Sequence, residues 1–335
     1  MRRVPRRVAD GLDAGLEATV LLSFSRFGSL TRGRLFGWAE PASGSMAGQT
    51  VVLTGATGGL GSAIATALSR LGATIWLVAR NGDKAAVLAS RIRAEVTDAR
   101  VETAVADLTR LSDVRDVAAR LLAGSDRLDV LIHNAGVLMS RHELTTDGIE
   151  TTAQLHLVAP FLLTSLLLPR LRETPAARVI TVSSGGMYTR KLNVAALEPA
   201  PADFNGVTAY AATKRAQVVL TEEAARRCQG SDIAFHVTHP GWVNTPGLRT
   251  SLPRFERLAG PMLRSPQQGA DTIVWLASTP RGVAWPGGQF WHDRRPRSTI
   301  RLPGTATPTG EAARLWDWAS AHAGVQLTRT SGAAQ

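Results

Sequence analysis

From residue 50 onward the chain alternates short apolar segments with amphipathic ones, and this alternation constrains the fold more than any other feature. The expected strands cover residues 50–54, 74–79, 101–105, 128–133, 178–183 and 232–239, and the longest expected helices cover residues 148–171 and 207–227. Strands that are apolar throughout are typical of a parallel sheet covered by helices on both faces. The sequence therefore predicts an α/β fold with a doubly wound parallel sheet.

The 335-residue chain divides into three parts around this pattern: an N-terminal extension over residues 1–48, one domain over residues 49–292, and a tail over residues 293–335 with a short helix. Residues 8–27 of the extension form an expected amphipathic helix, which a linker rich in Gly, Pro and Ser follows. A single apolar stripe usually faces a core, so we expect this helix to pack on the domain. Because arginines flank the stripe, peripheral membrane contact through residues 1–30 is the alternative.

Composition limits the compartment and the partners. A single cysteine, Cys228, cannot close a disulfide within the chain, which favours a reducing, cytoplasmic environment. The net charge of +11 favours anionic partners, but we find neither the basic helix nor the interleaved aromatic residues that nucleic-acid binding requires. His236 and His239 lie three residues apart on an expected strand and face opposite ways, so no metal site is expected. The sequence does not decide the oligomeric state.

A glycine-rich turn, Thr54-Gly55-Ala56-Thr57-Gly58-Gly59-Leu60-Gly61, lies between the first expected strand and its helix. Glycines permit a tight turn and a close approach of the backbone to a pyrophosphate, and the helix N-terminus offers unpaired N–H groups. In this position the turn predicts dinucleotide binding. The residues expected to bind are Gly55, Thr57, Gly58, Gly59, Leu60 and Gly61.

The end of the second expected strand indicates which dinucleotide is bound. An NAD enzyme of this architecture usually carries an acidic residue there for the ribose hydroxyls, whereas this chain has Arg80. A guanidinium pairs with a 2′-phosphate in fork geometry, and a carboxylate would repel it. We therefore predict a preference for NADP(H), with NAD(H) as the alternative.

Tyr210 and Lys214 lie four residues apart at the start of an expected helix. This spacing places the phenol and the ammonium on one helix face, with their Cβ atoms about 5–6 Å apart. A nearby cation is expected to lower the phenol's pKa from its usual value of about 10, which would make Tyr210 a usable acid-base group. Ser183 and Ser184 end the fifth expected strand at the ligand-binding edge of the sheet, where a hydroxyl could hydrogen-bond a carbonyl.

Together these motifs resemble the short-chain dehydrogenase/reductase family over about residues 50–291, which implies a Rossmann-type doubly wound sheet. The resemblance implies Tyr210 as the acid-base residue, Lys214 as the cation that also holds the nicotinamide ribose, and Ser184 as the partner of the substrate carbonyl. Further motifs of the family imply cofactor contacts at Asp107, Leu108, Asn134, Ala135, Gly136, Pro240, Gly241, Val243 and Thr245. Four segments look still closer to one subgroup, which also carries an N-terminal segment of similar size.

Two histidines depart from the family's pattern. The family places an asparagine in the long helix, where it anchors a water of the proton relay, and the matching residue here is His156. Because imidazole can bind water or pass a proton, we interpret His156 as a substituted relay residue, with packing as the alternative. An asparagine of the family is likewise replaced by His133, which we expect to pack beneath the loop.

The sequence thus predicts an NADP(H)-dependent oxidoreductase that interconverts a secondary alcohol and a carbonyl on a small molecule. The expected pocket wall is apolar, which favours a lipophilic substrate. Its expected residues are Met187, Leu192, Phe204, Trp242, Leu248 and Phe255. The alternative is a membrane-associated or scaffolding dinucleotide-binding protein with weak or no catalysis, suggested by His156 and the basic N-terminal segment.

Overall fold

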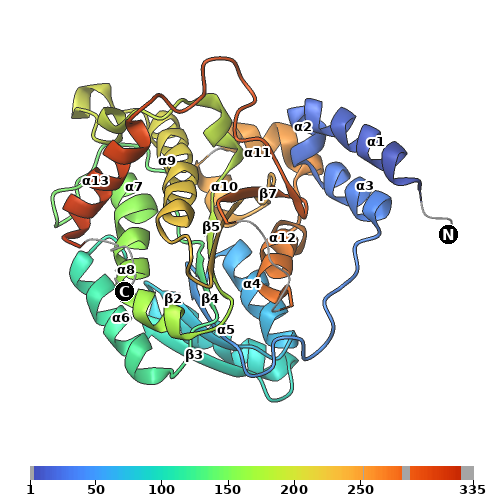
Figure 1. The fold of residues 1–335 in the computed structure, drawn as a ribbon, viewed down its shortest axis with the longest axis horizontal. Helices are drawn as coiled ribbons and strands as arrows, with labels where there is room; N and C mark the ends of the chain where they lie inside the picture. Colours follow the sequence, from blue (N-terminus) through green and yellow to red (C-terminus); the bar gives the residue numbers. More distant parts are fainter. Residues whose placement is uncertain (1–3, 252, 281–286, 326–335) are drawn as a thin grey trace, which may run out of the picture.

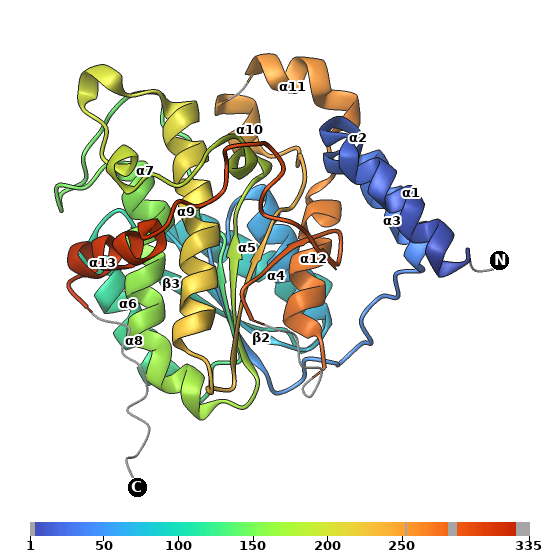
Figure 2. The ribbon, with the colours of Figure 1, turned by 45° about the horizontal axis from the view of Figure 1, so that its top comes forward.

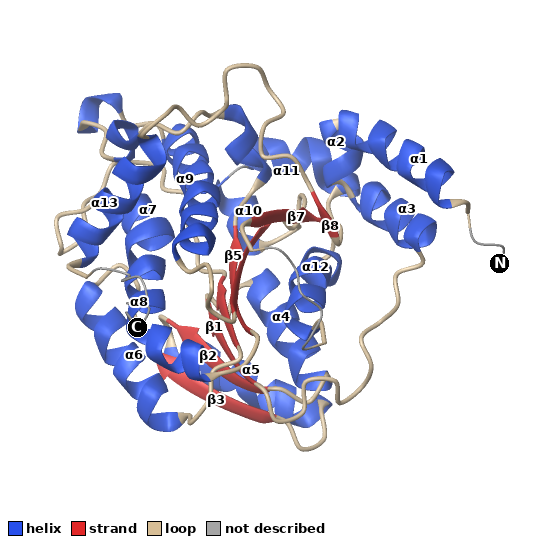
Figure 3. Ribbon diagram, viewed as in Figure 1, coloured by secondary structure: helices blue, strands red, loops and turns tan. Residues whose placement is uncertain are grey.

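The computed structural model describes residues 4–251, 253–280 and 287–325, so residues 1–3 of the expected extension and 326–335 of the expected tail lie outside it. The sheet has the strand order β3-β2-β1-β4-β5-β6-β7-β8 (Figure 3). The strands are β1 (Thr50–Thr54), β2 (Thr74–Ala79), β3 (Arg100–Val105), β4 (Val130–His133), β5 (Ala177–Val182), β6 (Ile233–Thr238), β7 (Gln289–His292) and β8 (Arg295–Pro296). All pairings are parallel except that of β7 with β8. The predicted doubly wound sheet is confirmed, with β8 as an addition.

Helices cover both faces of the sheet because its strand residues are apolar on both sides (Figure 1). In β1, Val51 and Leu53 pack against one helical layer, and Val52 packs against the other. The first layer contains α4 (Gly59–Arg70), α5 (Gly82–Glu95) and α12 (Pro266–Ser278). The second contains α6 (Leu111–Gly124), α8 (Ala159–Glu173) and α9 (Gly206–Arg227), with α13 (Glu311–Ala323) packed outside α8 and α9.

The helix that leads into α8 is continuous but irregular. It begins with α7 (Thr151–Ala153), passes through a π-helical turn at Gln154–Val158 and continues as α8. The whole stretch Thr151–Glu173 is long and apolar enough to cross a membrane, but 72% of its most apolar window is buried inside the protein. A buried core helix explains its composition.

The N-terminal segment forms three helices, α1 (Arg6–Ala18), α2 (Val20–Phe24) and α3 (Arg26–Phe36), where the sequence predicts one over residues 8–27. The breaks fall at Thr19 and Ser25, whose backbones are extended. Gly28 allows α3 to follow α2 at close range, because a Cβ there would lie 2.4 Å from the carbonyl oxygen of Leu22. The short helices therefore fold back on one another beside α11 (Pro253–Ala259) (Figures 1 and 2).

Candidate active site

The glycine-rich turn joins β1 to α4 at the carboxyl edge of the sheet. Gly55 has a φ of +63°, and a Cβ on it would lie 2.7 Å from the Cα of Ala135. A Cβ on Gly61 would lie 2.3 Å from the carbonyl oxygen of Gly55. Gly58 precedes α4 without a side-chain cap, so the first N–H groups of the helix stay available to a ligand. Thr57 and Leu60 lie in the same turn, and Leu60 packs partly into the core beneath it.

The loop after β4 supports this turn from behind. The Asn134 side chain donates to the carbonyl oxygens of Thr54 and Gly55, each at 3.1 Å. The backbone N–H groups of Asn134 and Ala135 donate to the Thr54 hydroxyl at 3.0 and 3.2 Å. Asn134 therefore holds the shape of the glycine-rich turn through its side chain.

Arg80, Asp107 and Leu108 lie just beyond the carboxyl ends of β2 and β3, on the same edge of the sheet. Arg80 is exposed, and the neighbouring Asn81 caps α5. Asp107 accepts hydrogen bonds from the backbone N–H and the hydroxyl of Thr109 at 3.0 and 2.7 Å, which fixes its carboxylate at the edge. Leu108 is buried beside it.

The two serines after β5 have different surroundings. Ser183 is buried, and its hydroxyl donates to the backbone carbonyl of Lys214 at 2.8 Å. Ser184 is partly exposed and lies close to the Tyr210 phenol, and its hydroxyl accepts a hydrogen bond from the backbone N–H of Gly186 at 3.4 Å. Ser183 therefore ties the strand to α9, and Ser184 is the hydroxyl available to a substrate.

Tyr210 and Lys214 lie on one face of α9, with the Lys214 Nζ 5.4 Å from the centre of the Tyr210 ring. The ammonium donates to the carbonyl oxygen of Val182 at 3.0 Å and to Oε1 of Gln217 at 3.1 Å. Burial lowers the pKa of Lys214 to about 7. Burial also raises the pKa of Tyr210, although the nearby Ser184 hydroxyl opposes this shift. The expected lowering of the phenol's pKa is thus wrong. Burial is the largest influence on both groups, and it raises the pKa of Tyr210 and lowers that of Lys214.

Both ring nitrogens of His156 have partners. Nε2 accepts from the backbone N–H of Val137 at 3.0 Å, and Nδ1 lies 2.8 Å from the Thr213 hydroxyl. That hydroxyl donates to the carbonyl oxygen of Tyr210 at 3.0 Å, so Nδ1 carries the ring proton and donates to Thr213. Burial and Lys214 hold the pKa of His156 well below its usual value. The ring is therefore neutral and connects the loop after β4 to α9.

Sequence reasoning missed Gln217, which lies three residues after Lys214 on α9 and is buried. Its amide nitrogen donates to the backbone carbonyl of His156 at 3.0 Å, while its oxygen accepts from Lys214. In a regular α-helix, the N–H of residue 160 would bond to that carbonyl, but Pro160 has none. Two sequence signals could have revealed this link: a proline four residues after His156, and a glutamine on the face that carries Lys214.

The segment Pro240 to Thr245 completes the site beside the glycine-rich turn. Gly241 has a φ of +80°, and a Cβ there would lie 2.3 Å from the Arg264 guanidinium. Val243 is buried and forms a β-bridge with Arg264. A Cβ on Gly59 would lie 3.5 Å from the methyl group of Thr245, so this segment approaches the turn closely.

The six residues expected to form an apolar wall have different surroundings. Trp242 and Phe255 contact each other edge to face at 5.1 Å between ring centres, and Phe204 packs on His142. Met187 and Leu192, in contrast, are buried in separate core clusters. Both are apolar residues of an irregular segment, as wall residues would be. Only their packing in the folded chain shows that they belong to the core.

The other tyrosine and three of the remaining histidines are structural. Tyr188 is buried, and its hydroxyl donates to the carbonyl of Ser298 at 3.0 Å. His133 is buried with Nε2 2.8 Å from the Thr164 hydroxyl, which confirms the expected packing beneath the loop, and burial lowers its pKa to about 3. His236 contacts Trp291, and His239 stacks on His292.

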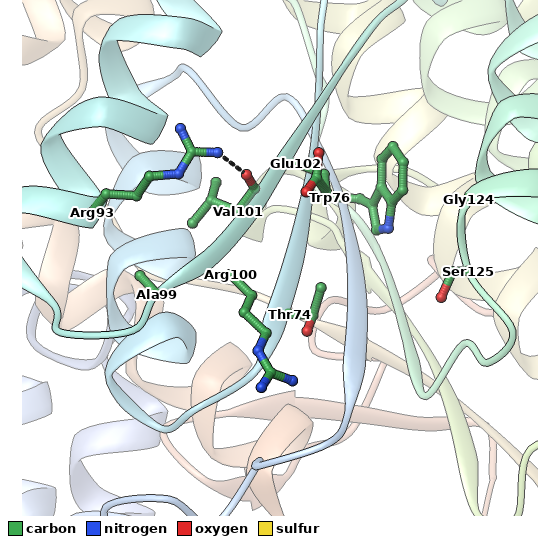
Figure 4. Close-up of a pocket in the computed structure, with 9 residues that line it drawn as sticks. All are labelled: Thr74, Trp76, Arg93, Ala99, Arg100, Val101, Glu102, Gly124 and Ser125. Carbon is green, nitrogen blue, oxygen red and sulfur yellow. Dashed lines mark hydrogen bonds between the residues drawn. The ribbon is translucent and has the colours of Figure 1, made fainter.

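A hollow lined by residues of β2 and β3 lies outside this site, and Figure 4 shows its lining. It encloses about 560 Å³ and begins at Thr74 and Arg100, which are the first residues of β2 and β3. Ligands of open α/β sheets bind at the carboxyl ends of the strands, whereas this hollow lies at the amino ends. A second cavity, of about 50 Å³, lies behind the site against His156 and Gln217.

Comparison with known proteins identifies a family, curated relatives and solved structures that this chain resembles. The short chain dehydrogenase family profile matches residues 49–254. The chain is 38% identical over 269 residues to dehydrogenase/reductase SDR family member 12 of Bos taurus, which covers 80% of this chain and 84% of that protein. It is 32% identical over 334 residues to retinol dehydrogenase 14 of Mus musculus, which covers 95% and 98%. The structure of Pseudomonas aeruginosa RhlG with NADP in its active site has a TM-score of 0.61 at 26% identity, covering 74% and 95%. The expected resemblance to one subgroup of the family is confirmed. That subgroup is dehydrogenase/reductase SDR family member 12.

Proposed function

This chain belongs to the short-chain dehydrogenase/reductase family of oxidoreductases acting on CH–OH and C=O groups, and we propose that it interconverts a secondary alcohol and a carbonyl on a lipophilic small molecule with NADP(H). The observation that carries this proposal is the convergence of Ser184, Tyr210 and Lys214 beside the glycine-rich turn. Ser184 lies close to the Tyr210 phenol, and the Lys214 Nζ lies 5.4 Å from the centre of the Tyr210 ring, at the edge where α/β sheets bind ligands. A protein that only binds a dinucleotide needs no such set.

The residues fit a dinucleotide, because the glycine-rich turn is tight enough to exclude side chains at Gly55 and Gly61 and α4 presents N–H groups without a side-chain cap. When bound, the cofactor supplies or accepts the hydride. In the reductive direction, Ser184 holds the substrate oxygen and Tyr210 gives it a proton; in oxidation the phenolate takes that proton back. The raised pKa keeps the Tyr210 phenol protonated at neutral pH, as reduction requires. We assign His156 to positioning, since neither ring nitrogen is free.

Tyr210→Phe tests the acid-base assignment, with Tyr188→Phe as a matched control because it removes the hydroxyl of the other tyrosine. We expect Tyr210→Phe to lose about 10²–10⁴-fold in turnover while it keeps its affinity for NADPH. Tyr188→Phe should keep its turnover, since that hydroxyl donates to the backbone carbonyl of Ser298. Turnover with a panel of hydrophobic ketones and aldehydes and NADPH fluorescence titration measure both properties. Full turnover in purified Tyr210→Phe would end the assignment.

Arg80 supports NADP(H) as the preferred cofactor, because its exposed guanidinium follows β2 at the cofactor-binding edge. An NADP-bound structural relative is consistent with this preference. A charge-assisted hydrogen bond contributes about 1.5–3 kcal/mol, so Arg80→Asp should weaken NADPH binding by about 10–100-fold and leave NADH binding similar. Dissociation constants for both cofactors measure the effect. Equal loss for NADPH and NADH would contradict a 2′-phosphate contact.

A further inference from the structure

The N-terminal helices attach to the domain through their acidic residues. Asp13 and Glu17 of α1 pair with the fully buried Arg32 of α3 at 2.6 and 2.7 Å. Arg32 also pairs at 2.7 Å with Asp293, the residue after β7, and Arg297 pairs with Asp13 at 2.8 Å. The acidic side of the amphipathic helix therefore faces the protein interior. The sequence predicts that the apolar stripe faces the domain; this holds for Phe24, which is buried against Tyr188 and Trp242, whereas other residues of the stripe, such as Leu12 and Phe27, are exposed.

This orientation leaves the apolar side chains of the segment on the surface. Val8 and Leu12 lie four residues apart on one side of α1, and Leu12 is 53% exposed. On α3, Phe27 is 52% exposed and Leu30 lies one turn further on. Val20, Leu21 and Leu22 of α2 are also exposed. Eight of the fifteen large hydrophobic residues that are exposed in the described part of the chain lie within residues 4–30.

The exposed charges that accompany these side chains are basic. Arg6, Arg7, Arg26 and Arg34 are exposed on α1 and α3. The acidic residues of the same segment face arginine: besides Asp13 and Glu17, Asp10 pairs with Arg295 at 2.9 Å. Apolar side chains edged by arginine are typical of helices that lie in the plane of a membrane.

The helix α11 lies next to the N-terminal helices and is linked to them by aromatic contacts. Phe24 of α2 contacts Trp242 edge to face at 5.9 Å, and Trp242 contacts Phe255 of α11. Leu258 of α11 is 84% exposed, and Arg254 and Arg257 are exposed near it. Figure 2 shows α11 next to α2. We call α1, α2, α3 and α11 together the docking face.

We propose that the docking face binds the surface of an anionic lipid bilayer, with the apolar side chains of α1, α2 and α3 in the headgroup region and the surrounding arginines on lipid phosphates. A second copy of this chain suits the face less well, because the centre of a protein interface is depleted of charge and would meet the same arginines. This inference goes beyond the proposed oxidoreductase activity and does not depend on it.

Vesicle flotation of the full-length protein tests the proposal, with phosphatidylcholine vesicles that contain or lack phosphatidylglycerol. We expect the protein to float with the anionic vesicles, to stay behind with neutral ones, and to lose binding as salt is raised from about 0.1 to 1 M. The variant Leu12→Ser/Phe27→Ser should bind at least about tenfold more weakly. The control Val87→Ser removes a 70% exposed apolar side chain from α5 and should bind like the wild type.

Thermal unfolding shows whether each variant is folded, and a second variant, Arg26→Glu/Arg34→Glu, tests the charge separately. This variant should lose binding to anionic vesicles and remain folded, because both arginines are exposed. The proposal would be overturned if the wild-type protein floats with neither kind of vesicle. It would also be overturned if Leu12→Ser/Phe27→Ser floats as well as the wild type. A third contrary result would be a wild-type dimer that Leu12→Ser/Phe27→Ser converts to a monomer. None of these readouts requires turnover, so they are independent of the test of Tyr210.

Discussion

At the residue scale, Gln217 links the two halves of the site. It holds Lys214 through its amide oxygen and the π-helical turn through its amide nitrogen. Gln217 acts through Lys214, and both ring nitrogens of His156 are held by Val137 and Thr213, so we assign both residues to positioning. The proposed chemistry remains with Ser184, Tyr210 and Lys214.

We expect Gln217→Glu to raise the pKa of Lys214, because a carboxylate 3.1 Å from the ammonium favours its charged form. The pH dependence of turnover should then shift to higher pH, while Gln217→Leu should lower turnover without that shift. The pH–rate profiles of both variants measure this difference. A merely structural role would lower turnover in both variants and leave the two profiles alike.

Lys214 also makes stability depend on pH. Its pKa of about 7 lies below that of an unfolded lysine, about 10.4, so between these values the unfolded chain binds a proton that the folded chain lacks. Stability therefore rises with pH in this window by about 1.4 kcal/mol per pH unit for one proton. Urea unfolding of cofactor-free protein at pH 7, 8 and 9 should show this rise relative to Lys214→Met. Parallel curves for the two proteins would contradict the lowered pKa.

At the element scale, the irregular helix before α8 lets the backbone carbonyl of His156 accept a hydrogen bond from the Gln217 side chain. Pro160 has no N–H to donate to the carbonyl oxygen of His156. The π-helical turn places this carbonyl against the Gln217 amide. A regular helix would leave the Gln217 amide without this acceptor.

Pro160→Ala restores the missing N–H, which can then compete with Gln217 for the His156 carbonyl. We expect stability equal to or slightly above that of the wild type, because alanine favours the helix, together with a several-fold loss of turnover. Thermal unfolding and steady-state kinetics separate the two effects. Unchanged turnover would show that this carbonyl does not position Lys214 through Gln217.

At the scale of the whole molecule, one buried carboxylate joins distant parts of the chain. Asp293 pairs with Arg32 at 2.7 Å and with Arg264 at 2.6 Å. Arg264 in turn donates to the carbonyl oxygen of Phe24 at 3.0 Å, and its backbone exchanges hydrogen bonds with Trp242 and Asn244. The N-terminal helices, the sheet edge and the loop beside the cofactor site therefore share one network.

We expect Asp293→Asn to lower the free energy of unfolding by about 3–5 kcal/mol, because two buried guanidinium groups lose their carboxylate. The arginines hold the pKa of Asp293 far below its usual value, so its contribution is present above pH 4 and falls as the pH decreases further. The control Glu143→Gln breaks an exposed pair with Arg141 and should cost at most about 1 kcal/mol. Urea unfolding at pH 7 and pH 3 compares the three proteins. Equal losses in both variants at pH 7 would contradict the role of this network.

The sequence by itself determined the parallel sheet, the glycine-rich turn and the shared face of Tyr210 and Lys214, because these depend on periodicity and on spacings of a few residues. The tertiary structure decided which groups are desolvated and what each one bonds. Local pattern could not foresee that Thr213 and Val137 would occupy both nitrogens of His156. Nor could it foresee that the acidic side of the first helix would turn inward, because Arg32 meets Asp293 from 261 residues away.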